Sequence, residues 1–262
     1  MTYYTTAPIT SVRKENYRVN TLELDCNLPA ARPGQFVMVW LPGMDEKPFC
    51  IVNAVPLRLS VAAVGPFSAK LLEFKAGDKL SVRGPFGRGF WLPKGAESVL
   101  LVGGGYGVAA LNFLAGQAVA AGVKPVMVIG ARTKADVIFE NDFKRLGVEA
   151  FVSTDDGSQG FKGRAHELVG KLIGEGRKFD CVYACGPELM MAAVAKVAQG
   201  HKIPSQLAIE RYMGCGVGVC GKCDAGGGLV CKEGPVFTGE ESLALVEFGK
   251  CHRDTMGRRK KW

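Results

Sequence analysis

The 262-residue sequence predicts an antiparallel β-barrel, then a doubly wound parallel-sheet α/β domain, then a small cysteine-bearing segment. Three observations lead to this prediction. Short apolar runs broken by turn residues extend to about residue 95. After Gly95, strand-like and helix-like patterns alternate. Four closely spaced cysteines follow residue 210. We therefore expect domains at 1–95, 96–204 and 205–262.

The first part has the pattern of a small barrel, because its apolar runs are short and alternate with polar residues. Pro33-Gly34, Gly77-Asp78 and Gly84-Pro85 separate these runs at a spacing typical of tight turns. The runs that predict its strands are 9–12, 18–24, 35–41, 57–62 and 79–82.

The second part alternates buried strands with amphipathic helices, which predicts a parallel sheet covered on both faces. The expected strands are 98–102, 125–129, 149–152, 180–184 and 206–209, and the expected helices are 108–121, 134–146, 164–174 and 187–199. Ligands of such sheets bind beyond the carboxyl ends of the strands. Residues 103–107, 130–133, 154–157 and 185–187 should therefore share one crevice.

The first strand-to-helix turn of this domain is rich in glycine, at Gly103, Gly104, Gly105 and Gly107. Small residues there would admit a pyrophosphate to a helix N-terminus, where backbone amides favour negative charge. The dinucleotide fingerprint is incomplete, because Val108 replaces its last glycine and the second strand is followed by Arg132 rather than an acidic residue. Nucleotide binding and simple close packing both remain open for this turn.

A second turn at a strand end contains Cys185, Gly186 and Pro187. Pro187 suits the first position of the following helix, because proline is common there. Cys185 either lines the crevice or is a small core residue.

The four cysteines are Cys215, Cys220, Cys223 and Cys231, and their spacing is C-x4-C-x2-C-x7-C. The first three match the plant-type [2Fe-2S] ligand pattern, in which each iron takes two thiolates. Seven glycines between residues 214 and 228 let the backbone fold tightly around such a cluster. Zinc is the alternative, but zinc sites usually have a second close cysteine pair. The odd total of nine cysteines and the lack of a signal peptide disfavour disulfides and predict a cytoplasmic protein.

The composition is 47% hydrophobic and 22% charged, which is typical of a soluble globular protein. The sequence contains no apolar run long enough for a membrane span. Its net charge of +8 is partly concentrated in a C-terminal tail with five basic residues and one acidic residue after position 250. A solvated tail is expected rather than nucleic-acid binding.

The histidines, His166, His201 and His252, lie in no nucleophile pattern, so we predict no catalytic side chain.

The order of these parts, with Gly-Gly-Gly-Tyr-Gly and Cys-Gly-Pro, resembles the ferredoxin-NADP reductase superfamily. The resemblance implies an FAD-binding barrel, an NAD-binding α/β domain and a [2Fe-2S] cluster segment. Its two barrel motifs correspond to 47–50 and 65–68, although Lys47 replaces the usual arginine and Cys50 the usual serine. An ordinary barrel strand is the alternative for 47–51. The implied flavin contacts are Lys47, Pro48, Phe49, Cys50, Val61, Ala62, Gly65, Phe67 and Ser68.

Within that superfamily, the whole chain is similar to the electron-transfer subunit of type B dihydroorotate dehydrogenase. The segments that carry this similarity are 33–40, 84–90, 154–157, 210–213, 231–237 and 247–250. The resemblance implies a partner subunit that contains FMN and oxidises dihydroorotate in pyrimidine biosynthesis, with two copies of each subunit. Electrons would then pass through the cluster and FAD to NAD.

Three alternatives remain at this point. The short loop before Cys231 also resembles the gamma subunits of sulfhydrogenases and a related sulfite reductase subunit. A self-sufficient NAD(P)H-linked flavin reductase and a zinc-stabilised interaction protein are the other two. The choice between NAD and NADP stays open, because Arg132 is compatible with a contact to a ribose phosphate and with simple exposure to solvent. Because electrons must enter from outside, we expect Met213, Val217, Val219 and Leu229 to form an apolar rim for the partner.

Overall fold

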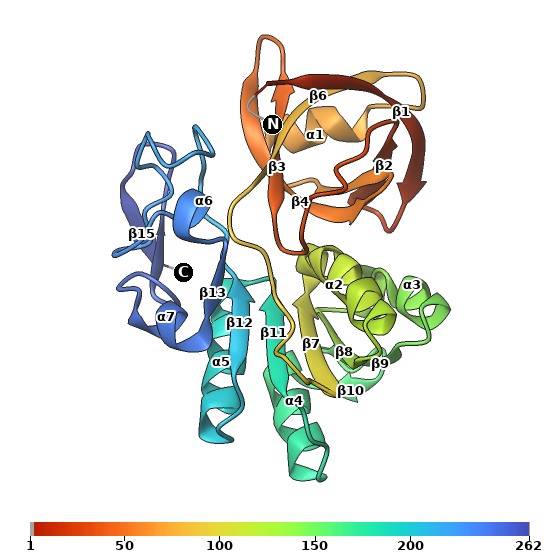
Figure 1. Cartoon of the computed structure of the whole chain (residues 1–262), viewed down its shortest axis with the longest axis vertical. Helices are drawn as coiled ribbons and strands as arrows, with labels where there is room; N and C mark the ends of the chain where they lie inside the picture. Colours follow the sequence, from red (N-terminus) through yellow and green to blue (C-terminus); the bar gives the residue numbers. More distant parts are fainter. Residues whose placement is uncertain (1–2, 262) are drawn as a thin grey trace.

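The computed structural model describes residues 3–261 and begins with a closed six-stranded barrel, in which every neighbouring pair is antiparallel (Figure 1). The strand order is β1-β2-β5-β4-β3-β6. Alternate residues such as Leu57 and Leu59 are buried inside the barrel, as a period of two requires. Its elements are β1 (Thr5–Lys14), β2 (Val19–Leu24), β3 (Phe36–Leu41), β4 (Asp45–Ala54), β5 (Leu57–Ala62), α1 (Pro66–Leu72) and β6 (Lys79–Phe86).

The second part is a seven-stranded sheet of order β10-β9-β8-β7-β11-β12-β13, parallel except for β13. Its strands are β7 (Ser98–Gly104), β8 (Lys124–Ala131), β9 (Glu149–Thr154), β10 (Phe161–Lys162), β11 (Cys181–Cys185), β12 (Ser205–Ala208) and β13 (Val236–Thr238). Its helices are α2 (Val108–Ala120), α3 (Glu140–Arg145), α4 (Ala165–Gly174) and α5 (Glu188–Gly200), with short turns η1 (Gly105–Gly107) and η2 (Lys134–Asp136).

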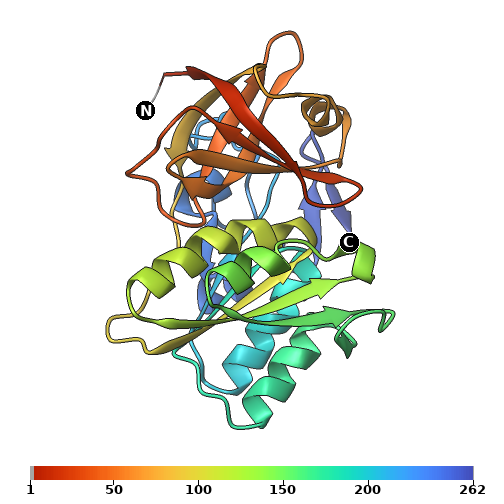
Figure 2. The same ribbon diagram turned by 90° about the vertical axis from the view of Figure 1, so that its right-hand side faces the viewer.

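Both faces of this sheet are covered, which is why its central strands are apolar throughout. On β7, Val99 and Leu101 belong to the core that contains the buried face of α2, whereas Leu100 and Val102 belong to the core beneath α4 and α5. Figure 2 shows α2 lying between the barrel and the sheet. The predicted fold class is therefore confirmed.

The helix predicted at about 134–146 is interrupted in the structure. The chain instead forms η2, an extended residue at Val137 and the short helix α3. Phe139, which precedes α3, has a left-handed backbone with φ of 63°. This break turns both Ile138 and Phe139 into the core, so tertiary packing overrides local helix preference.

The cysteine-bearing part returns to the sheet through β13, which pairs with β12. Strand β12 lies inside the predicted range 205–262 although it belongs to the parallel sheet, and the three domain ranges stay a prediction. The remaining elements are α6 (Val230–Glu233), α7 (Gly239–Ala244), β14 (Cys251–Arg253) and β15 (Arg259–Lys261). Sequence patterns did not predict these short elements. None of the helices in residues 3–261 has the length and hydropathy of a membrane span.

Candidate functional site

A cavity of about 440 Å³ lies between the barrel and the parallel sheet. Its walls come from β4, from α1, from the start of α2 and from the linker that follows β12. The structure thus brings together most of the predicted flavin contacts and three residues of the predicted crevice. These predicted residues in the wall are Lys47, Pro48, Phe49, Cys50, Ala62, Gly65, Phe67, Ser68, Tyr106, Gly107 and Cys185.

The other predicted contacts lie outside the wall. Val61 packs inside the barrel, whereas its neighbours Ser60 and Ala62 line the cavity. Arg132 follows β8 and is exposed. Gly103, Gly104, Gly105, Gly186 and Pro187 lie beside the cavity without lining it, and Pro187 caps α5 rather than beginning it.

The glycines of the first turn meet two different needs. A Cβ atom on Gly107 would lie 2.6 Å from the Cys185 carbonyl, and one on Gly104 would lie 2.5 Å from Met190 Sδ. These glycines therefore let the end of β7 pack against β11 and α5. Gly105 has open space around it but a φ of 54°, which a glycine adopts without strain.

Tyr106 and Glu210 face the same cavity, and their contact was not foreseen from the sequence. The Tyr106 hydroxyl donates to Glu210 Oε2 at 3.1 Å. The cavity admits solvent to Glu210, yet the surrounding walls desolvate its carboxyl group and raise its pKa, with a further contribution from Glu188. Burial also raises the pKa of Cys50 to about 12 and raises that of Cys185, so both thiols are neutral at pH 7.

Lys47 lies at the edge of the cavity with its charge held in place. Its Nζ donates to the Tyr212 hydroxyl at 3.0 Å, pairs with Asp45 and lies 4.3 Å from the centre of the Tyr212 ring. Partial burial opposes the charged form, but the bonds to Asp45 and Tyr212 prevail and raise the pKa of Lys47.

Several residues of the cavity wall were not predicted from the sequence. Glu210 and Tyr212 belong to the segment 210–213, which carries part of the family resemblance, but nothing in the sequence indicated that this segment lines the cavity. Sequence reasoning also missed the wall residues Phe36, Val52, Ser60, Val64, Ala109, Ala110, Ile209, Arg211, Met213 and Pro235.

The four cysteines are arranged as two neighbouring pairs. The Cys220 backbone N–H donates to Cys215 Sγ, and the Cys231 backbone N–H donates to Cys223 Sγ, each at 3.4 Å. This arrangement fits a two-iron cluster, because each iron takes two thiolates. Among residues 3–261, no three His, Cys, Asp or Glu side chains are gathered as a site for a single metal ion.

Backbone amides of the loop point at the cysteine sulfurs. Cys215 Sγ accepts from the N–H groups of Val217, Val219 and Cys220 at 3.3 to 3.4 Å, and Cys231 Sγ accepts from Gly218 at 3.1 Å. Burial opposes ionisation of Cys215, but the three donors lower its pKa to about 6. Burial and the adjacent Cys223 raise the pKa of Cys231 to about 12. The loop therefore supplies the sulfur-directed donors that iron–sulfur sites use.

The first part of the cysteine loop, and the segment that enters it, rest against the rest of the chain. Gly216 has a φ of 71°, and a Cβ there would lie 2.8 Å from Met38 Cγ on β3. At the loop entrance, the Arg211 guanidinium forms a two-pronged ion pair with Glu188 at the start of α5. Both side chains are almost fully buried, with exposed fractions of 1% and 3%.

Only two of the four residues predicted for the apolar rim lie at the surface, and their contact with a partner stays a prediction. Val217 and Val219 are exposed, by 44% and 83%. Met213 is only 4% exposed and lines the cavity. Leu229 packs against the core that lies beneath α4 and α5. The two wrong assignments arise because the loop folds back onto the sheet, which buries its flanking residues.

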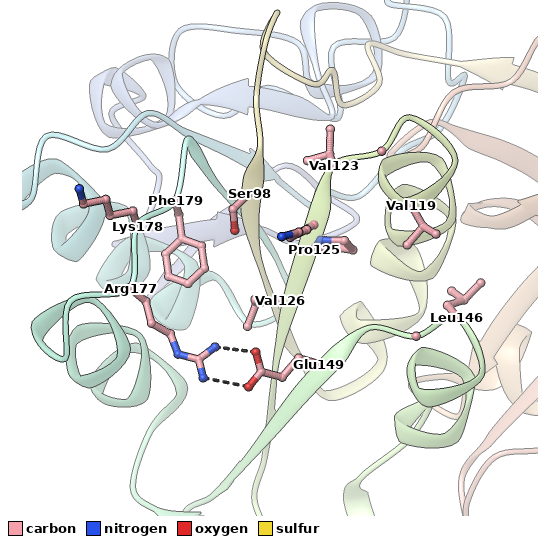
Figure 3. A pocket seen from close by; sticks show the side chains of 13 residues that line it. Ser98, Val119, Val123, Pro125, Val126, Leu146, Glu149, Arg177, Lys178 and Phe179 are labelled. Carbon is pink, nitrogen blue, oxygen red and sulfur yellow. Dashed lines mark hydrogen bonds and ion pairs between the residues drawn. The ribbon is translucent and has the colours of Figure 1, made fainter.

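A second hollow of about 590 Å³ lies at the starting ends of β7, β8 and β9. Figure 3 shows the Arg177–Glu149 ion pair beside it, with N–O distances of 2.6 and 2.8 Å. This hollow lies at the amino-terminal ends of the strands, whereas the predicted crevice lies at their carboxyl ends. The barrel motifs lie at the cavity between the barrel and the sheet instead, together with Cys50, Cys185 and Glu210, whose pKa values are raised by burial.

This fold and site define a class: reductases of the ferredoxin reductase type that also carry an iron–sulfur segment. A solved structure described as an NADH-dependent reduced ferredoxin-NADP oxidoreductase is 32% identical, with a TM-score of 0.82 over 93% of this chain and 92% of that one. Phthalate dioxygenase reductase, at 20% identity, shares the fold with a TM-score of 0.62 over 75% of this chain and 64% of its own.

Residues 210–242 match the model of the iron–sulfur cluster binding domain of dihydroorotate dehydrogenase B. A relative from Methanocaldococcus jannaschii named "Probable dihydroorotate dehydrogenase B (NAD(+)), electron transfer subunit" is 41% identical over 96% of both chains. One of the same name from Methanothermobacter thermautotrophicus is 44% identical over 88% of this chain and 87% of its own. The chain belongs to the family of dihydroorotate dehydrogenase B electron transfer subunits, and the predicted family is confirmed.

Proposed function

We propose that this chain carries electrons from a dihydroorotate dehydrogenase catalytic subunit, through a [2Fe-2S] cluster and FAD, to NAD. The continuity of the two sites supports this most strongly. Residues 209–213 form part of the cavity wall, and the first cysteine of the loop follows at Cys215. A flavin in the cavity and a cluster on the cysteines would therefore share one short segment of chain.

The cavity would hold the FAD. Lys47 supplies a positive charge for the pyrophosphate, as a point charge rather than the fork of an arginine. Phe49, Cys50 and Ala62 supply an uncharged wall for the ring system, since the Cys50 thiol stays protonated. When bound, a flavin connects one-electron transfer at a cluster with two-electron transfer at a nicotinamide.

The paired cysteines would hold the cluster, with Cys215 and Cys220 on one iron and Cys223 and Cys231 on the other. The loop's amide donors orient these sulfurs and offset their negative charge. We place NAD at the carboxyl ends of β7, β8 and β11, near Gly105, Arg132 and Gly186, because nucleotides bind at that edge of such sheets.

The partner would be a cytoplasmic catalytic subunit that contains FMN, with two copies of each chain in the complex. Val217 and Val219 are exposed on the loop that carries Cys215 and Cys220, so a partner docked there would lie close to the cluster. Apolar groups at the centre of an interface are stabilised by their removal from water.

A second candidate is the flavin and iron–sulfur subunit of another redox complex. The 32% identity to the structure described as a ferredoxin-NADP oxidoreductase favours it. The electron donor separates the two candidates, since only the first requires dihydroorotate oxidation in the partner.

Purification of the chain without oxygen tests its cofactors. We expect one FAD and two irons with two sulfides per chain, and we expect NADH to bleach the flavin absorption and produce the electron paramagnetic resonance signal of a reduced cluster. A colourless protein, or one that holds zinc in place of iron and sulfide, would contradict the proposal.

A further inference from the structure

Arg83 on β6 joins the barrel to the cysteine loop. Its Nε and Nη2 atoms donate to the Glu46 carboxylate of β4 at 2.5 and 2.7 Å. The same Nη2 donates to the backbone carbonyl of Cys215 at 2.6 Å. An arginine–glutamate pair thus directly contacts a residue that we assign as a cluster ligand.

This pair is held in a poorly hydrated place. The exposed fractions of the Arg83 and Glu46 side chains are 13% and 14%. The guanidinium carbon lies 5.2 Å from the centre of the Phe86 ring and 5.7 Å from that of Tyr4, and the Tyr4 hydroxyl donates to Glu46 at 2.9 Å. Charges fixed in such surroundings interact more strongly than exposed ion pairs do, because little water screens them.

We propose that Arg83 and Glu46 tune the reduction potential of the iron–sulfur cluster in opposite directions, an inference that rests on the proposed function. Cluster potentials depend on nearby charge, hydrogen bonds and exposure to solvent. Reduction adds one negative charge to the cluster, so Arg83 favours the reduced form and Glu46 opposes it. When both charges are present their effects largely cancel, so the loss of either charge alone shifts the potential.

The two single variants therefore have opposite effects. Arg83→Gln leaves the carboxylate uncompensated and shifts the cluster potential to more negative values. Glu46→Gln leaves the guanidinium uncompensated and shifts it to more positive values. Arg83→Lys keeps the charge and stays near the parent, as does the double variant Arg83→Gln/Glu46→Gln. A pair that only braced the loop would be broken in either single variant, so both would shift the potential in the same direction.

The experiment is a redox titration of the full-length holoprotein, followed by electron paramagnetic resonance, after iron and sulfide analysis of every variant. Arg177→Gln is the matched control. Arg177 also forms a two-pronged pair with a glutamate and lies 4.8 Å from an aromatic ring centre, but at the starting ends of the sheet strands (Figure 3). It should leave the potential unchanged.

Opposite shifts in Arg83→Gln and Glu46→Gln support the proposal. Shifts of the same sign, or no shift in variants with full iron and sulfide, overturn it while leaving the proposed function intact. If Arg83→Gln fails to assemble the cluster, the other two single variants still decide. Glu46→Gln should shift the potential to more positive values, and Arg83→Lys should leave it unchanged. A parent protein without iron and sulfide would instead refute the cluster assignment, and this proposal with it.

Discussion

At the residue scale, the division of nine cysteines into ligands and bystanders is open to a direct test. Replacing Cys215, Cys220, Cys223 or Cys231 by serine should abolish or cripple the cluster, because a hydroxyl is a poor ligand for iron in a sulfur environment. The same change at Cys26, Cys181 or Cys251 should leave iron and sulfide at the parent level. Cys231→Ser with an intact cluster would mean that another residue is the fourth ligand.

Lys47 tests the assignment of the cavity to flavin. Lys47→Ala removes the charge that we assign to the pyrophosphate and should weaken FAD binding by about 1.5 to 3 kcal/mol, or about 10- to 150-fold in Kd. Lys47→Arg should bind FAD at least as well as the parent. Tyr212→Phe is the control, because it removes the hydroxyl that Lys47 contacts but keeps the charge. Equal flavin retention in Lys47→Ala and the parent would show that Lys47 does not contact FAD.

Glu210 should make the stability of the apoprotein depend on pH. Desolvation in the cavity holds its pKa above the ordinary value of 4.5. Between pH 4.5 and the higher pKa of the folded state, a rise in pH removes this proton from the unfolded chain before it leaves the folded one. The free energy of unfolding therefore falls over this range. Glu210→Gln cannot lose a proton, so its advantage over the parent should grow from pH 4.5 to pH 7.5 in denaturant titrations. Glu240→Gln, on the exposed surface of α7, removes the same charge and is the matched control. An advantage that stays constant over this range would contradict the prediction.

At the element scale, the buried Arg211–Glu188 pair fixes the start of α5 to the segment that enters the cysteine loop. The Gly249 amide also donates to Glu188 Oε1, at 2.7 Å, so the C-terminal region is tied to the same point. Glu188→Ala would leave the buried guanidinium uncompensated and should lower the free energy of unfolding by about 3 to 5 kcal/mol. The double variant Glu188→Leu/Arg211→Met should lose less than the sum of the single variants. A loss below about 1 kcal/mol in Glu188→Ala would contradict this role.

Sequence patterns predicted the elements whose burial can be recognised from their own residues and missed those determined by distant contacts. The central strands of the sheet are apolar along their length, so their positions followed from composition alone. The break before α3 did not, because it depends on a core pocket that receives Phe139. The cysteine spacing predicted the cluster ligands, but the Tyr106–Glu210 contact joins residues 104 positions apart and had no local signal.

At the scale of the whole molecule, the exposed part of the cysteine loop is where we expect the partner to dock. Val217 and Val219 are exposed, whereas Met213 and Leu229 pack against the chain itself. An interface at the loop therefore depends on fewer apolar residues from this segment than the sequence indicated. Charged substitutions at Val217 or Val219 would oppose the burial of that surface without touching the flavin cavity.

The most direct test of the central claim is NAD reduction by dihydroorotate, measured with this chain and the catalytic subunit from the same source. We predict a stable complex that forms NADH, and we predict loss of this activity in Val217→Asp or Val219→Asp while both subunits keep their flavins. Cys223→Ser should likewise stop NADH formation without stopping dihydroorotate oxidation by an artificial acceptor. NADH formation by the catalytic subunit alone, or undiminished activity with Cys223→Ser, would contradict electron transfer through this chain.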